Sequence, residues 1–149
     1  MKILKLAFWS ILFFSLLLLV FSLLIPSHVR ISRAIDIQAG KAQVLPLIST
    51  NDGWTKWNAY AQDSSGKFRF EIRSVSDSLV EADWTAGNKT YPSNLALYGL
   101  KSGTLTVQWY VDFKLSWYPW EKFGSILYDN QMGPVMEQSL RQLKALAEK

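Results

Sequence analysis

The sequence lacks cysteine altogether and holds a single histidine, His28, which excludes several kinds of chemistry. Without cysteine the chain can form no disulfide, no zinc–thiolate centre and no thiol nucleophile. The one histidine follows directly on a long apolar run, so no imidazole is left in the body of the chain for a Ser-His-Asp triad or a multi-histidine metal site. We therefore expect neither a metal site nor a cofactor.

An excess of charge of one sign is also missing. The net charge of the 149 residues is +4, and removing Lys2 and Lys5 from the 16 basic residues leaves 14 against 12 acidic ones. The basic residues are scattered along the chain, whereas a surface that follows a phosphate backbone needs a cluster of them. We expect no nucleic-acid partner. The length is enough for one domain and an anchor.

A long uncharged run occupies residues 6–25, LAFWSILFFSLLLLVFSLLI. A helix of this length spans about 30 Å, the thickness of the hydrocarbon core of a bilayer, and Pro26 would end it. The alternative is a cleaved signal peptide, but such peptides have a shorter apolar part followed by a small-x-small site, which residues 24–28 do not offer. We predict a single-pass transmembrane anchor over residues 1–26 and one domain over residues 27–149.

The side of the membrane follows from the charges that flank this run. Lys2 and Lys5 precede it, and a short basic N-terminus usually stays in the cytoplasm. Arg30 and Arg33 follow the run, so the charge difference between its two ends is small. The expected location of the domain is the extracytoplasmic side.

Alternation of apolar and polar residues predicts the strands. It is clearest over residues 104–116, where every second residue from Leu105 to Leu115 is apolar, which is typical of a strand with one buried and one solvated face. Further strands are predicted at four other places, with loops at 87–93 and 101–103 between them. These four are residues 29–38, 68–75, 79–86 and 94–100.

Two short helical segments are predicted between the first and second strands, over residues 40–50 and 51–60. In the second, Trp54, Trp57 and Tyr60 are three residues apart, so their rings share one face of a helical turn. The favoured interpretation is a hydrophobic plug that closes the domain. Stacking of a ligand on these rings is the alternative.

The C-terminal segment, residues 119–148, carries apolar residues at spacings near three and four, which predicts an amphipathic helix. Gly133-Pro134 interrupts the pattern, so we expect a kink or a break there. The favoured reason is a bend that fits the helix to a curved sheet, and a hinge that opens a cavity is the alternative. The predicted fold class is α+β: a curved antiparallel sheet of about five strands wrapped on a long C-terminal helix.

This layout resembles the helix-grip, START-like superfamily, also called SRPBCC, and most of all its polyketide cyclase/dehydrase-like branch, some members of which carry an N-terminal membrane helix. The resemblance covers most of residues 29–147. It lies in VRISRAIDIQ, the short helix that follows, WTKWNAY, GTLTVQWYVDF and EKFGSILYDNQMGPVMEQSLRQLKAL. The family usually has more strands between its short helices and its terminal helix than the four predicted here, so one hairpin is missing or reduced.

The resemblance implies that the domain binds an apolar small molecule or lipid between the sheet and the C-terminal helix. The residues expected to line the cavity belong to the apolar face of the sheet and the inner side of the helix. They are Phe70, Ile72, Trp84, Leu97, Trp109, Val111, Phe113, Phe123, Leu127 and Met136. Each of them could equally be a core residue. A non-catalytic protein-interaction module with a collapsed cavity is the second hypothesis.

An enzyme similar to the polyketide cyclases and dehydrases is the third hypothesis, and it needs an acid or a base in the cavity. The candidate carboxylates and phenols show no pair that stands out, so no catalytic residue is assigned. Among them, Glu71 and Asp112 are expected to face away from the apolar side of the sheet. The candidates are Asp36, Glu71, Glu81, Asp83, Asp112, Tyr60, Tyr98 and Tyr110.

Overall fold

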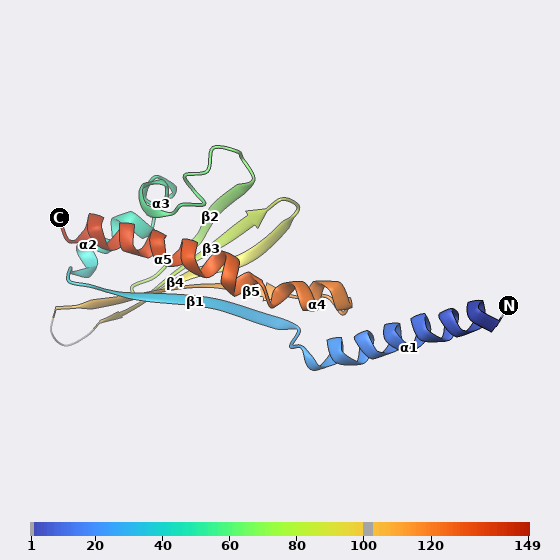
Figure 1. The fold of residues 1–149 in the computed structure, drawn as a ribbon. Helices are drawn as coiled ribbons and strands as arrows, with labels where there is room; N and C mark the ends of the chain where they lie inside the picture. The colour runs from blue at the N-terminus through green and yellow to red at the C-terminus, as the bar shows by residue number, and fades with distance from the viewer. Residues whose placement is uncertain (1, 100–102) are drawn as a thin grey trace.

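A computed structural model describes residues 2–99 and 103–149 as an α+β domain from which one helix extends (Figure 1). This is the predicted fold class. In chain order the elements are α1 (Lys2–Leu24), β1 (His28–Ile37), α2 (Lys41–Ile48), α3 (Asn51–Trp57), β2 (Phe68–Val75), β3 (Leu79–Ala86), β4 (Lys89–Gly99), β5 (Leu105–Lys114), α4 (Pro119–Ser125) and α5 (Tyr128–Ala147).

The five strands form one antiparallel sheet in the order β1-β5-β4-β3-β2. The alternation in β5 has the predicted effect, because Leu105, Val107, Trp109, Val111 and Phe113 are all buried. Residues paired across strands share a face, so the pairing of Trp109 with Leu95 continues this apolar face into β4. The helix α5 crosses the apolar face and packs most extensively against β1, the edge strand (Figure 1).

The strand β4 is longer than predicted. It begins at Lys89, so the expected loop over residues 87–93 is wrong. Gly87 and Asn88 alone form the turn after β3, and Gly87 adopts a positive φ of 61°, which glycine tolerates without steric cost. The loop was predicted because Pro92 lies in this segment and proline is uncommon inside strands. Most of the turn expected at 101–103 lies outside the described residues.

A kink or a break was expected at Gly133-Pro134, and the break is wrong, because α5 is a single helix from Tyr128 to Ala147 with Pro134 inside it. The helical path is interrupted earlier, between α4 and α5. Gly133 has a different role, since a Cβ atom there would lie 2.1 Å from Nη2 of Arg33 on β1. The Arg33 guanidinium pairs with Asp129 and Glu137, each at 2.9 Å, so it lies across α5 with one acidic partner on either side of the glycine.

The helix α3 closes one end of the space between sheet and helix. Trp54 and Trp57 are fully buried, and their indole nitrogens donate hydrogen bonds to the carbonyl oxygens of Ile48 and Leu47 at 2.6 and 2.9 Å. Both rings pack edge-on against Trp109. The plug interpretation is therefore confirmed for these two residues. Tyr60 lies beyond the end of α3, in the following turn.

The helix α1 projects from the domain at the end of the sheet where β1 begins (Figure 1). Of its residues Lys2–Leu24, Ser22 is the only buried one. It is the one helix of the described chain that is long and apolar enough to cross a membrane. Near the C-terminal end of α1 the helix α4 packs against it, and Lys122 Nζ donates a hydrogen bond to the Ile25 carbonyl oxygen at 2.8 Å.

Candidate functional site

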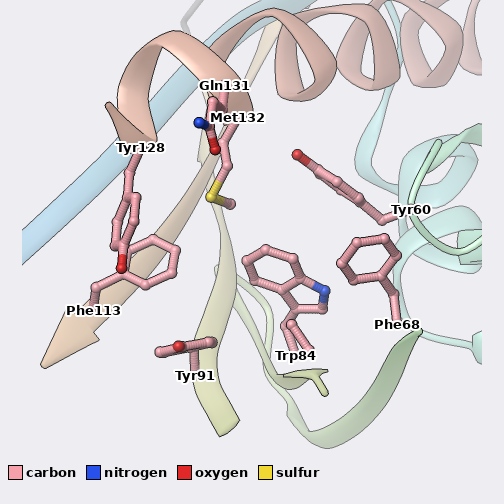
Figure 2. A pocket seen from close by; sticks show the side chains of 9 residues that line it. Tyr60, Phe68, Trp84, Tyr91, Phe113, Tyr128, Gln131 and Met132 are labelled. Carbon is pink, nitrogen blue, oxygen red and sulfur yellow. The ribbon is translucent and has the colours of Figure 1, made fainter. Parts of the chain in front are cut away.

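An aromatic pocket of about 320 Å³ lies between the sheet and the first turns of α5 (Figure 2). Six of its lining side chains are aromatic, and Met132 of α5 covers them from above. We call this site the aromatic pocket. It is lined by Tyr60, Phe68, Trp84, Ala86, Tyr91, Phe113, Tyr128, Gln131 and Met132.

The strand register explains why these residues meet. Trp84 pairs with Tyr91 across the β3–β4 hairpin, and Ala86 pairs with Phe68 of β2. Paired residues point to the same face, so all four side chains enter the space under α5. Phe113 of β5 extends this wall towards β1. These positions lie at the end of the sheet where β1 begins, which is the end that carries α1.

Contacts between rings hold the wall in shape. Ring centroids are 4.7 Å apart for Tyr91 and Phe113, 5.0 Å for Phe113 and Tyr128, and 5.2 Å for Tyr60 and Trp84. The three pairs are tilted, with interplanar angles of 52°, 56° and 41°, and ring pairs at such distances stabilise an aromatic cluster beyond the burial of its surface. The pocket is therefore largely pre-formed, which lowers the entropic cost of binding.

The polar groups of the pocket are few. Burial raises the pKa of the Tyr60 and Tyr91 hydroxyls above the ordinary tyrosine value, so both stay neutral at physiological pH. The indole nitrogen of Trp84 is buried and has no hydrogen-bond partner among the described residues, on the side of the ring near Phe68. The Gln131 amide adds one further donor and acceptor. This surface suits a mainly apolar molecule.

The structure brings only two of the ten predicted lining residues, Trp84 and Phe113, into the aromatic pocket. Phe70 stacks behind Trp84 at 6.2 Å and lines a smaller depression beside α3. Ile72 is partly buried and packs against the core. The other core residues among the ten are Leu97, Trp109, Val111 and Met136.

The two predicted residues from the start of the C-terminal segment lie away from the pocket. Phe123 is half-buried on α4, and Leu127 is 53% exposed. The chain turns between α4 and α5 at Ile126 and Leu127, so neither Phe123 nor Leu127 belongs to α5. Even a helix continued back from α5 would carry Leu127 on its outer side, because Leu127 and Met136 are about two and a half turns apart.

Seven lining residues were not among the ten predicted ones, although Tyr60 had been named as a possible stacking ring and acid–base candidate. Phe68 is in phase with Phe70 on an alternating strand. Met132 lies one helical turn before Met136, which the analysis did select. Tyr91 was hidden because its strand was read as a loop. The remaining four are Tyr60, Ala86, Tyr128 and Gln131.

The candidate carboxylates lie on the outer face of the sheet. Asp112 pairs with Arg30 at 2.6 Å, and it faces away from the apolar side as predicted. Asp36 accepts a hydrogen bond from Thr106, while Asp83 pairs with Arg73 at 3.4 Å. Of all the acid–base candidates only Tyr60 lines the aromatic pocket. The described lining thus contains phenols and an amide but neither a carboxylate nor a histidine.

Comparison with known proteins bears on the fold. No protein-family model matches the chain, and no curated protein matches it. Among solved structures, a START superfamily protein from Mycobacterium smegmatis superposes with a TM-score of 0.59 at 12% identity, covering 81% of this chain and 97% of its own. The protein BH1534 from Bacillus halodurans gives 0.59 at 13% identity, covering 83% and 100%.

A third structure, DynU16 from the dynemicin biosynthetic locus, gives a TM-score of 0.58 at 13% identity, covering 80% of this chain and 47% of its own. Identities this low establish a shared fold and nothing more. The chain therefore has the START-like, helix-grip fold that the sequence predicted, built here on a sheet of five strands.

Proposed function

Since the fold is START-like, we propose that this chain binds an apolar small molecule or lipid in the aromatic pocket while α1 anchors it in a membrane. The observation that carries the proposal is the pocket itself. Its volume of about 320 Å³ lies in the range of small-molecule sites, and its lining is aromatic with a few polar groups. A collapsed cavity would have favoured the protein-interaction module instead.

The position of the pocket supports a link between binding and the membrane. The α1 helix ends at Leu24, and Val29 of β1 already pairs with Phe113 in the pocket wall. Only a few residues thus separate the proposed membrane span from the site. An apolar ligand is sparingly soluble in water, so a site close to the bilayer shortens its transfer through water.

The proposed topology places the N-terminus in the cytoplasm and the domain on the other side, because Lys2 and Lys5 precede the span. The absence of native cysteine makes this simple to test. A Ser64→Cys variant carries its thiol in the exposed loop between α3 and β2. Intact cells should label it with a membrane-impermeant maleimide, and labelling only after lysis would reverse the topology.

Catalysis is not proposed. A cyclase or dehydrase needs a group that accepts or donates a proton at the substrate. The described lining offers phenols whose pKa is raised further by burial, as at Tyr60 and Tyr91. Such groups are weak acids and are not poised to act as bases near neutral pH. Binding without chemistry is the function that this site supports best.

Photocrosslinking in membranes tests the binding function. Membranes containing the full chain are loaded with a diazirine derivative of palmitic acid, irradiated and analysed by peptide mass spectrometry. The expected result is adducts on peptides that contain pocket residues, such as Trp84 and Met132, in addition to adducts on α1. Labelling confined to α1 would contradict ligand binding while still agreeing with anchoring.

A matched pair of variants makes the result specific. Ala86→Phe fills the aromatic pocket from β3 and should remove the pocket adducts. Thr85→Phe adds the same ring one residue away, on the opposite face of the same strand. It should leave the adducts unchanged. Equal labelling of the two variants would mean that the fatty acid reacts elsewhere on the domain.

A further inference from the structure

Five large apolar side chains are exposed on one short segment, residues 117–127, which we call the interfacial patch. Trp117 is 65% exposed and Trp120 is 72% exposed. The Tyr118 ring lies between them, at 4.7 Å from Trp117 and 4.9 Å from Trp120. Ile126 and Leu127 complete the patch. Contiguous exposed apolar surface of this kind marks contact with a membrane or another molecule.

The interfacial patch is held beside the C-terminal end of α1. The helix α4, which follows Trp117 and Tyr118, packs against α1, and its Lys122 is only 5% exposed. Lys122 Nζ donates a hydrogen bond to the Ile25 carbonyl oxygen at 2.8 Å, and a cation at this end of a helix is favourable. The patch is thus fixed at the level where the apolar run of α1 stops.

The position of the patch relative to the bilayer determines what it contacts. The apolar run ends at Ile25, so the boundary of the hydrocarbon core of a membrane spanned by α1 lies close to this residue. Trp and Tyr prefer this boundary, because their rings are apolar and their N–H and O–H groups reach water. We propose that the interfacial patch inserts into the headgroup region of the same bilayer, an inference that rests on the proposed anchoring by α1.

Insertion of the patch would orient the whole domain, because α4 is tied to the sheet as well as to α1. Glu121 of α4 accepts a hydrogen bond from the Ser116 amide at 2.8 Å and pairs with Lys89 after the β3–β4 turn. The neighbouring Tyr128 lines both the aromatic pocket and a surface depression shared with Tyr118 and Trp120. The Tyr128 side of the pocket therefore faces the bilayer.

Nitroxide depth measurements test this on the full chain in bilayers of phosphatidylcholine and phosphatidylglycerol. Three single-cysteine variants of the cysteine-free chain are labelled: Phe13→Cys in the middle of α1, Ile126→Cys in the patch and Asp77→Cys in the turn at the far end of the sheet. Collision rates with oxygen, which concentrates in hydrocarbon, are compared with those of a nickel complex that stays in water. The ratio of the oxygen collision rate to the nickel collision rate at position 126 should lie between the ratios at positions 13 and 77.

The possible outcomes distinguish failure of membrane anchoring by α1 from failure of patch insertion. If the ratio at position 13 is that of a label in water, α1 does not span the bilayer and the anchoring proposal fails. If position 13 reads as hydrocarbon while position 126 matches position 77, anchoring holds and the interfacial patch does not insert. If position 126 is shielded from both oxygen and the nickel complex, protein covers the patch, and the inference is overturned as well.

A pair of variants tests the role of the rings in the Ile126→Cys background. Replacing Trp117 and Trp120 by serine should shift the ratio at position 126 to that of position 77. Replacing both by tyrosine keeps rings that favour the headgroup region and should preserve the original ratio. Both tryptophans are exposed, so neither pair of substitutions removes core packing. An unchanged ratio in the serine variant would overturn the proposal.

Discussion

Gly133→Ala is the substitution whose effect depends most on its surroundings. In an exposed helix interior this change stabilises a protein by about 1 kcal/mol, because alanine has the higher helix propensity. In this fold the new Cβ atom would lie 2.1 Å from Nη2 of Arg33, so the guanidinium must move. Its ion pairs with Asp129 and Glu137 would then be lost.

The two effects are of similar size and opposite sign. A partly exposed ion pair such as Arg33–Glu137 contributes about 0.2–1 kcal/mol, so its loss offsets much of the gain in helix propensity. With Arg33 present, Gly133→Ala should therefore leave the free energy of unfolding nearly unchanged. With Arg33→Ala in the background, the same change should raise it by about 1 kcal/mol.

The assay is a double-mutant cycle on the full chain in detergent, with urea unfolding followed by circular dichroism. The expected coupling between Arg33 and Gly133 is about 0.5–1 kcal/mol. Gly124→Ala is the control, because its Cβ position has no atom of another described segment within 4 Å. Its effect should be the same in both backgrounds. Equal stabilisation by Gly133→Ala in both backgrounds would show that Arg33 does not lie over the glycine.

Three further predictions concern the core, the anchor and the response to acid. Trp109→Asp should unfold the domain, because it places an unpaired charge at a site that is 1% exposed and breaks the hydrogen bond to Ser93. Thermal unfolding of this variant should show no cooperative transition. Tyr98→Asp on the exposed face is the control and should melt like the parent chain. Deleting residues 1–26 should give a soluble folded domain that an alkaline wash releases from the membrane fraction, because the interfacial patch alone is a peripheral contact. A truncated chain that resists the wash or never folds would count against the predicted boundary. Hydrogen bonds from Lys89 and Ser116 lower the pKa of Glu121 to about 2 from its ordinary 4.5, so this carboxylate stabilises the fold above pH 4.5 and the contribution is lost as the pH falls towards 2. Glu121→Gln should flatten the dependence of unfolding free energy on pH in that window, and identical acid profiles would refute the tie between α4 and the sheet.

Local patterns in the sequence were enough to determine most elements of the fold. The apolar run predicted α1, and strict alternation predicted the buried face of β5. The spacing of three between Trp54 and Trp57 predicted the plug that α3 forms. These signals are reliable because each reflects a repeat of the backbone itself, 3.6 residues per helical turn or two per strand.

Local patterns gave wrong predictions where the conformation of a residue depends on contact with another segment of the chain. Pro92 reads as a loop residue, yet β4 includes it because the strand pairs with β3 on one side. Gly133 reads as a helix breaker, yet it lies inside α5, where its missing Cβ atom leaves room for the guanidinium of Arg33, a hundred residues earlier in the chain. Arg33 and Gly133 share no sequence window, and Pro92 pairs with Asp83 only once the β3–β4 hairpin has formed.

The sequence by itself determined the fold class, the apolar helix and the buried face of β5. Only the tertiary structure decided where the pocket lies, because buried aromatic side chains look alike in sequence whether they fill a core or line a cavity. Trp109 and Trp84 alternate identically on their strands, yet α3 packs against the first ring and leaves space beside the second. That difference depends on where helices end above the sheet, which residue periodicity does not encode.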